Sequence, residues 1–92
     1  MTVQHEPAQN RFTAETDAGM AELEYVRKPG LIAYVHTGVP EGARGQGVGE
    51  ALVERGLAYA REEGLKVLPL CPFVKAYADK HPEAQDLIAQ AE

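Results

Sequence analysis

Apolar and polar residues alternate along much of the first forty positions. Residues 11–16 and 20–27 each alternate, and the Asp-Ala-Gly turn signal at residues 17–19 between them predicts a hairpin. A second turn signal, Lys-Pro-Gly at residues 28–30, precedes the run 31–39, whose apolar residues occupy both faces, as in a central strand. Three sequential strands of this kind favour an antiparallel meander.

A helical period replaces the alternation over residues 48–63, where apolar residues recur at three- and four-residue spacing. Gly64 stands where the left-handed residue that ends many helices belongs. Residues 66–70 then predict a short strand. Because Pro69 in this strand lacks a backbone donor, the strand must lie at an edge or part from its neighbour there.

Two shorter helical segments follow. Cys71-Pro72 opens the first, with the proline suited to its first turn, and the second covers residues 82–90. The order β-β-β-α-β-α-α predicts a single mixed α/β (α+β) domain over residues 10–92. Residues 1–9 carry no clean period and are interpreted as an N-terminal tail that pairs late or frays, with little chemistry expected there.

Composition narrows the classes of partner. The chain has 92 residues, enough for one domain, and 14 acidic against 9 basic residues give a net charge of −5. This balance argues against nucleic acids and acidic membranes as partners. No basic, apolar leader or membrane-spanning run is present, and the lone Cys71 cannot form an intrachain disulfide, so we expect a cytoplasmic protein. The histidines and the cysteine show no paired-ligand spacing, and we expect no metal.

The most informative segment is the glycine-rich turn before the main helix, Arg44-Gly45-Gln46-Gly47-Val48-Gly49. Such a turn exposes backbone amides at a helix N-terminus, where the helix dipole also favours an anion. The segment lacks the Lys-Ser/Thr ending of a P-loop, and Glu50 stands where the third glycine of a dinucleotide fingerprint would be. Plain turn chemistry is the alternative interpretation.

The pattern Arg44-x-x-Gly47-x-Gly49, preceded by Val39-Pro40-Glu41, resembles the acyl-CoA-binding motif of the GNAT superfamily of N-acetyltransferases. Further segments strengthen the resemblance to small single-domain members of that superfamily: His36-Thr37, Gly64-Leu65-Lys66-Val67, Leu70-Cys71-Pro72-Phe73-Val74 and His81-Pro82-Glu83. The resemblance covers roughly residues 10 to 85.

This resemblance implies a truncated GNAT-like fold with a mixed, splayed sheet that binds acetyl-CoA between its parting strands. The pyrophosphate would be held by the turn, that is by Arg44, Gly45, Gln46, Gly47, Val48 and Gly49, and the backbone of Val39 would orient the thioester. The usual N-terminal strand and helix pair of the superfamily are missing. We therefore expect a smaller substrate wall, or one that a second copy or another protein completes.

Three residues are candidates for the chemistry of amine acetylation. Cys71 stands at a helix N-terminus, where the dipole lowers a thiol pKa; it is either an acyl acceptor or a small buried apolar residue. His36 lies three residues before Val39 and is either the general base or a packed strand histidine. Tyr77 resembles the tyrosine that many GNAT enzymes place beside the CoA sulfur as general acid; the alternative is a core tyrosine.

The expected function is therefore the transfer of an acetyl group from acetyl-CoA to a primary amine of a small molecule or protein. Two alternatives remain open at this point. One is a CoA-binding module without turnover, and the other is a small interaction domain whose glycine loop binds no ligand.

Overall fold

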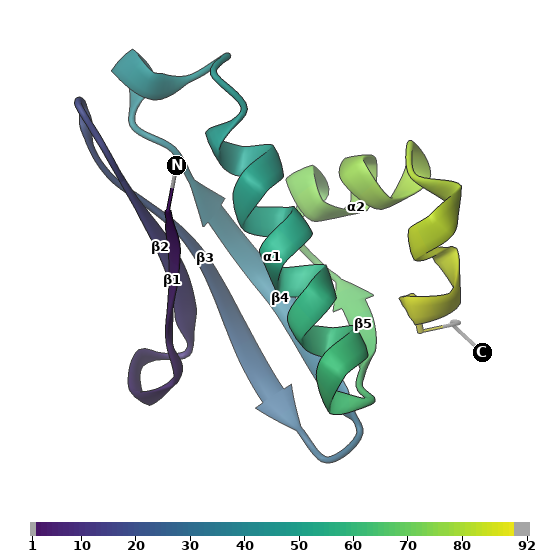
Figure 1. Cartoon of the computed structure of the whole chain (residues 1–92). Helices are drawn as coiled ribbons and strands as arrows, with labels where there is room; N and C mark the ends of the chain where they lie inside the picture. The colour runs from purple at the N-terminus through teal and green to yellow at the C-terminus, as the bar shows by residue number, and fades with distance from the viewer. Residues whose placement is uncertain (1, 90–92) are drawn as a thin grey trace.

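The computed structural model describes residues 2–89, and its centre is a five-stranded mixed sheet with strand order β1-β2-β3-β4-β5 (Figure 1). The first four strands pair antiparallel, and β5 pairs parallel with β4. This arrangement confirms the predicted mixed α/β fold and the antiparallel meander. The strands are β1 (Val3–Glu6), β2 (Arg11–Thr16), β3 (Gly19–Lys28), β4 (Leu31–Gly38) and β5 (Lys66–Pro69).

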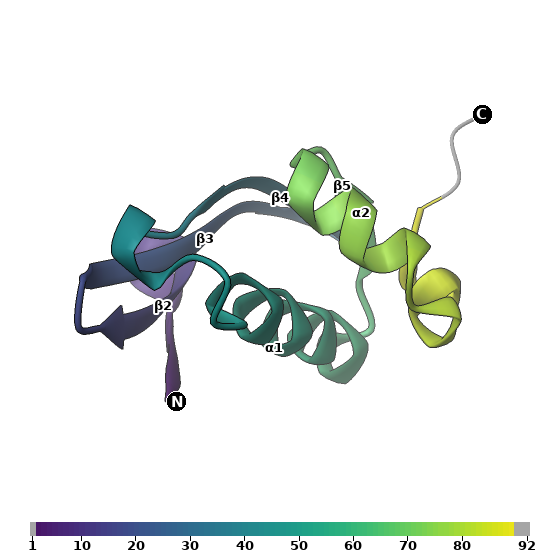
Figure 2. The ribbon, with the colours of Figure 1, turned by 90° about the horizontal axis from the view of Figure 1, so that it is seen from above.

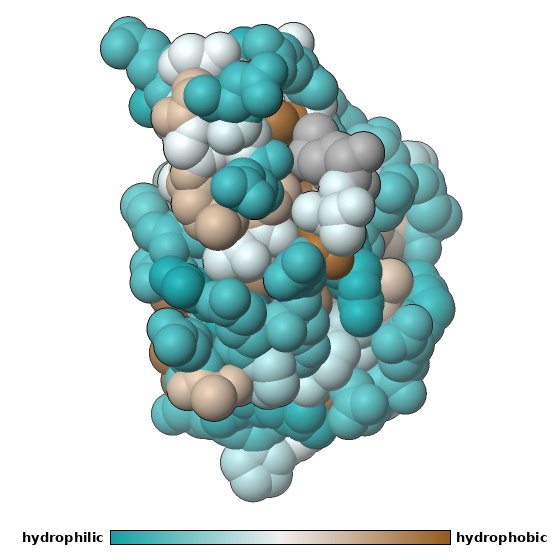
Figure 3. All heavy atoms as spheres, turned by 60° about the vertical axis from the view of Figure 1, so that its left-hand side comes forward, coloured by the Kyte–Doolittle hydropathy of each residue, from teal (hydrophilic) through white to brown (hydrophobic). Residues whose placement is uncertain are grey.

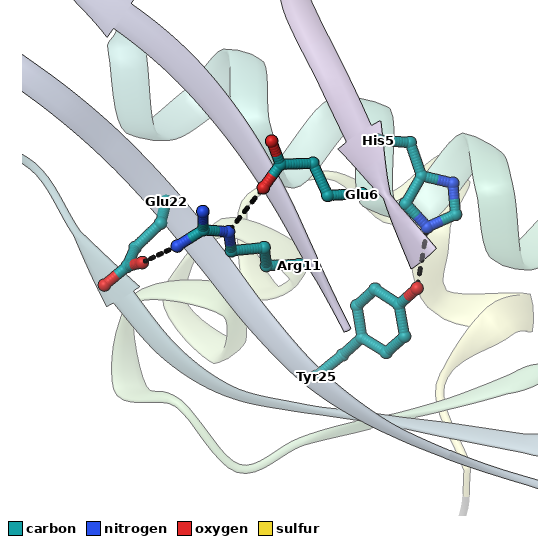
Figure 4. A network of polar contacts seen from close by, with 5 residues as sticks. All are labelled: His5, Glu6, Arg11, Glu22 and Tyr25. Atoms are coloured by element: carbon teal, nitrogen blue, oxygen red, sulfur yellow. Dashed lines mark hydrogen bonds and ion pairs between the residues drawn. The ribbon is translucent and has the colours of Figure 1, made fainter. Parts of the chain in front are cut away.

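The strand β1 lies within the segment predicted as a tail that pairs late or frays, and of these two alternatives the structure has pairing over residues 3–6. It pairs with β2, and its alternation places His5 on the side of the sheet that holds the core. The imidazole of His5 stacks on Phe12 with ring centroids 4.2 Å apart, and its Nε2 lies 2.7 Å from the hydroxyl of Tyr25 (Figure 4). These contacts with distant residues hold β1, and a local sequence pattern does not reveal them.

The other face of the N-terminal strands carries a chain of charges. Arg11 Nε donates to Glu6 at 2.6 Å, and its Nη1 lies 3.4 Å from Glu22, so that one guanidinium links β1, β2 and β3 (Figure 4). The Arg11 and Glu6 side chains are about one third exposed, so this network contributes little to stability.

The helix α1 (Val48–Glu63) covers one face of the sheet, and among the described residues no helix lies over the opposite face of β3 (Figure 2). Its buried residues Leu52, Val53 and Ala60 pack on the aromatic and aliphatic core of β2, β3 and β4. The helix ends at Gly64, as predicted, where a φ of 67° lets the amide of Leu65 donate to Ala60 O at 2.8 Å.

Shorter helical segments complete the chain: the 3₁₀ turns η1 (Pro7–Gln9), η2 (Glu41–Ala43) and η3 (Pro82–Leu87), and the helix α2 (Pro72–Asp79). The predicted last helix is thus a 3₁₀ helix that ends at Leu87, and residue 90 of that prediction lies outside the described residues. Within residues 2–89 no helix is long and apolar enough to cross a membrane.

The strands β4 and β5 part at Pro69. Their register runs from Leu31 opposite Lys66 to Tyr34 opposite Pro69, and one further bond follows, from the Cys71 amide to Tyr34 O at 2.9 Å. The chain then turns into α2, whereas β4 continues to Gly38. The last residues of β4 therefore have no strand beside them on this edge, which is the splay that the sequence predicted.

Candidate functional site

A pocket of about 340 Å³ lies where the end of β4 meets the N-terminal end of α1. Three elements form it: the end of β4, the glycine turn with the first turn of α1, and the first turn of α2. Its lining residues are Thr37, Val39, Ala43, Arg44, Gly45, Val48, Gly49, Glu50 and Phe73. The pocket thus contains five of the seven residues predicted to hold the cofactor, and Gln46 and Gly47 lie in the same turn outside the lining.

The glycine turn presents a series of backbone amides without backbone acceptors. Gly45 and Gly47 both have φ of 80°, a conformation that strains any residue with a side chain. Within residues 2–89, the first amide after Arg44 that has a backbone acceptor is that of Ala51, which donates to Gly47 O at 3.0 Å. The amides of residues 45–50 are therefore free to donate to an anion, with the positive end of the α1 dipole behind them.

Arg44 is folded back along the loop. Its Nε donates to Val39 O at 3.3 Å, which fixes the stem of the side chain while the guanidinium stays exposed beside the pocket. One cation therefore stands at the edge of the free amides. The same bond occupies one lone pair of the Val39 carbonyl and ties the end of β4 to the turn.

Gly49 allows α2 to approach α1 closely. A Cβ at this position would lie 2.7 Å from Cζ of Phe73, so the phenyl ring sits directly against the helix backbone. Phe73 adds an apolar side chain to the pocket, next to the end of the amide-rich segment at Gly49. The pocket therefore joins a polar, anion-compatible wall to an apolar one.

Cys71 is the N-cap residue of α2 and lies next to the pocket, with 6% of its surface exposed. Its Sγ is 3.3 Å from Oγ1 of Thr37, which lines the pocket. Burial raises the pKa of the thiol, but hydrogen bonds from the Thr37 side chain and the amides of Val74 and Phe73 outweigh it, and the net pKa lies below the ordinary value. The site therefore stabilises the thiolate relative to that of a cysteine in water.

His36 does not lie beside Cys71. Tyr25 pairs with Tyr34, whereas Glu24 pairs with His36, so Val35 is an extra residue in β4. This bulge shifts the alternation by one residue. Thr37 consequently faces the pocket, and the exposed His36 lies on the opposite face of the sheet.

On that opposite face His36 meets two carboxylates. Ligand atoms of Glu22, Glu24 and His36 all lie within 4.8 Å of one another, the one group among residues 2–89 with this geometry for a metal ion. Cross-strand pairing brings the three together, so sequence spacing does not reveal the group. Glu22 is already engaged by Arg11 at 3.4 Å.

Tyr77 also lies outside the pocket. Its ring stacks on His81 with centroids 3.9 Å apart, and it lines a groove between α1 and α2 together with Glu50 and Glu54. Burial, followed by the charges of Glu54, Glu83 and Glu50, raises the pKa of its phenol. The side chain is thus held in its protonated, donor-competent form.

Comparison with known proteins assigns the chain and its fold to a family. The family model described as GCN5-related N-acetyl-transferase matches residues 11–87. The chain belongs to the GCN5-related N-acetyltransferase family. Its fold also matches the solution NMR structure of a GCN5-like protein from Staphylococcus aureus, with a TM-score of 0.77 and 31% identity over 99% of this chain and 90% of that one.

Two curated relatives of this acetyltransferase-family chain are vertebrate proteins. Protein NATD1 of Gallus gallus is 30% identical over 89 residues, which cover 92% of this chain and 80% of the chicken protein. Protein NATD1 of Homo sapiens is 30% identical over the same length, with 92% and 78% covered. The resemblance stated from the glycine turn and its flanking segments is thereby confirmed.

Sequence reasoning missed two residues of this acetyltransferase-family site. Thr37 was quoted only as part of a motif, although it is the β4 side chain that reaches Cys71. In the sequence Glu50 marks only the position of a missing glycine, whereas in the structure it lines the pocket. A β-bulge hides the orientation of Thr37, whereas the position of Glu50 in the first turn of a helix beside a glycine turn was a usable signal.

Proposed function

We propose that this member of the acetyltransferase family transfers the acetyl group of acetyl-CoA to a primary amine. The observation that carries the proposal is the pocket, which has free amides on one wall and Thr37, with Cys71 behind it, on another. An acyl-CoA has complementary features, a diphosphate at one end of an apolar arm and a thioester at the other.

The glycine turn fits the diphosphate. The amides of residues 45–50 supply donors without competing backbone acceptors, and Arg44 adds a positive charge at their edge. Phe73 would contact the apolar pantetheine arm, and the backbone of Val39 would orient the acyl group. When bound, the carrier supplies a thioester carbonyl that is activated toward nucleophiles.

Cys71 is proposed as the acyl acceptor within the chain. Its thiolate attacks the thioester carbonyl, the new Sγ–C bond forms as the C–S bond to the carrier breaks, and the carrier leaves as a thiolate that takes up a proton. A primary amine then attacks the acetylated Cys71, and the thiolate of Cys71 leaves. The lowered pKa of Cys71 and its bond to Thr37 support this role.

The amine must lose a proton in the second step. His36 and Tyr77 remain the predicted base and acid, although neither lines the pocket. The exposed His36 lies on the same stretch of β4 as Thr37, on the opposite face, where Glu22 and Glu24 favour a cationic amine. A base must lie within hydrogen-bond reach of the amine that attacks Cys71, whereas the sheet lies between His36 and the pocket. His36→Ala tests this role: amine turnover equal to that of the wild type would exclude His36 as the base.

A second candidate function is carrier binding without turnover. The low exposure of Cys71 and the position of His36 outside the pocket favour this alternative. It requires the same free amides and the same pocket. The two functions differ only in whether Cys71 becomes acetylated and whether an amine is consumed.

Mass spectrometry of the protein incubated with acetyl-CoA tests the proposal. We expect carrier retention in native spectra and one added acetyl group on the Cys71 peptide after digestion, which then disappears when a panel of primary amines is supplied. Cys71→Ala should keep carrier binding and lose the acetyl group. Carrier binding without any acetylated Cys71 or amine product would support the binding module, and absence of carrier binding would refute both functions.

A further inference from the structure

The sheet face opposite α1 carries a row of apolar side chains across three strands. Val26 pairs with Ala33, and Ala33 pairs with Leu68, so these three residues lie side by side on β3, β4 and β5. Their strand neighbours Tyr25, Ile32 and Val67 are buried under α1, and alternation therefore turns the row outward. Val26 is 45% exposed, and Val35 beside the row is 40% exposed.

This outer face differs from the side that carries the β2–β3 hairpin. Figure 3 shows that side covered mostly by hydrophilic residues, with hydrophobic atoms in small separate areas. On the outer face no described helix covers β3 (Figure 2), and Val26 and Val35 are exposed there beside the partly exposed Ala33 and Leu68. A connected apolar face of this kind is a docking surface when its surroundings match a partner.

Charges of opposite sign flank the apolar row at equal distances. Along the outer face of β3, Glu24 lies two residues before Val26 and Lys28 lies two residues after it. Glu24 and Lys28 are therefore about 13 Å apart with Val26 midway between them, at a rise of about 3.3 Å per residue. Among residues 2–89 neither of the two charges forms an ion pair, whereas Arg27 on the inner face pairs with Glu63.

This pattern is complementary to itself under one particular rotation. A two-fold axis that runs along the row Val26–Ala33–Leu68 places each apolar residue against its own counterpart. The same rotation reverses the strand direction, so that Glu24 of each copy lies opposite Lys28 of the other. An axis parallel to the strands and over β3 would instead bring Glu24 close to Glu24, which is unfavourable.

We propose that the outer face of β3, β4 and β5 binds a second copy of this chain, with the two-fold axis along the row Val26–Ala33–Leu68. The two sheets then pack face to face, as in a β-sandwich, with the apolar row at the centre and two Glu24–Lys28 pairs at the rim. The pocket on the α1 side stays open in this arrangement. His36, which pairs with Glu24 in the sheet, lies at the edge of the interface.

Sedimentation velocity from about 10 μM to about 1 mM protein tests the dimer, a range that covers weak to moderate association. The wild-type chain should shift from monomer to dimer with concentration. Val26→Asp should stay monomeric, because it places charge at the centre of the interface. Glu62→Lys, which changes an exposed charge on α1, is the matched control and should dimerise like the wild type. Circular dichroism checks that each variant is folded.

Charge exchange tests the orientation of the two copies. Glu24→Lys and Lys28→Glu should each weaken the dimer about tenfold or more, because each places like charges opposite each other twice. The double variant Glu24→Lys/Lys28→Glu should regain most of the affinity. A wild-type chain that is monomeric throughout, a dimer that persists in Val26→Asp, or a double variant as weak as the single ones would overturn the proposal.

Discussion

The hydroxyl of Tyr34 donates to the carbonyl oxygen of Gly56 at 2.6 Å, a buried bond that joins the central strand β4 to the middle of α1. The approach is close enough to exclude a side chain at position 56. A Cβ there would lie 2.9 Å from both the Tyr34 hydroxyl and Cδ2 of Leu23. The distance between α1 and the sheet, and with it the position of the pocket, therefore depends on this glycine.

Gly56→Ala should lower the free energy of unfolding by about 1 to 3 kcal/mol, as overpacking of a core does. On an open helix surface the same change would stabilise by about 1 kcal/mol, so the sign of the effect is informative. Urea denaturation measures it. Removal of the clashing hydroxyl in Gly56→Ala/Tyr34→Phe should make the combined loss smaller than the sum of the single losses. An alanine variant as stable as the wild type would contradict the close packing.

Gly47→Ala should weaken binding of coenzyme A, because a φ of 80° at this position orients the free amides and strains alanine by about 1 to 2 kcal/mol. Thermal unfolding with and without coenzyme A measures both stability and binding. Gly30→Ala is the matched control, since Gly30 has a φ of 74° in the turn between β3 and β4, far along the chain from the pocket. The control should lose similar stability and keep the full ligand shift. Equal ligand shifts in both variants would argue against the glycine turn as the anion site.

Thr37→Val should raise the pKa of the Cys71 thiol, because it removes the side-chain hydrogen bond that favours the thiolate. The rate of alkylation by iodoacetamide, followed by mass spectrometry across pH, should then reach its midpoint at higher pH than in the wild type. Thr37→Ser retains a hydroxyl and should restore the lower midpoint. Identical midpoints for the valine and serine variants would show that the hydroxyl does not act on the thiol.

His5 should make the protein less stable at mildly acidic pH. Burial, and then the charges of Arg55 and Arg27, hold the pKa of His5 below its ordinary value of 6.5 in the folded chain. The unfolded chain therefore binds this proton first, so the stability that neutral His5 contributes is complete above about pH 6.5 and falls as the pH drops toward the folded pKa.

The change appears in urea midpoints measured between about pH 7.5 and about pH 5.5, a range chosen around the ordinary pKa of histidine. His5→Phe keeps a ring to stack on Phe12 and removes the titration, so its midpoint should depend less on pH over this range. Carboxylates that titrate in both proteins cancel in the comparison. Parallel pH profiles for the two proteins would rule out His5 as the origin.

Features set by neighbouring residues were predictable from the sequence. The glycine turn, the helix over 48–63 and its end at Gly64 all depend on local conformation and periodicity, and the structure has them at these positions. The place of β5 at the edge of the sheet also follows from one local property, the missing donor of Pro69.

Features set by pairing between distant segments were not predictable. The strand β1 depends on the contacts of His5 with Phe12 and Tyr25. Thr37, and not His36, lies beside Cys71 because of the register of β4 against β3, which simple alternation cannot reveal. The group of Glu22, Glu24 and His36 likewise requires the sheet to be assembled first.

The extra residue at Val35 divides β4 into two parts with different roles. The residues before Val35 pack in the aromatic core. The residues after it include Thr37, which contacts the Cys71 thiol and lines the pocket. Removal of Val35 would shorten β4 without turning Thr37 away, because the residues after the bulge keep their partners on β3. A residue inserted between His36 and Thr37 would change which side chains of this part of β4 face the pocket. Evolution and design can therefore vary the strand length at one point and change the reactive side chain at the other.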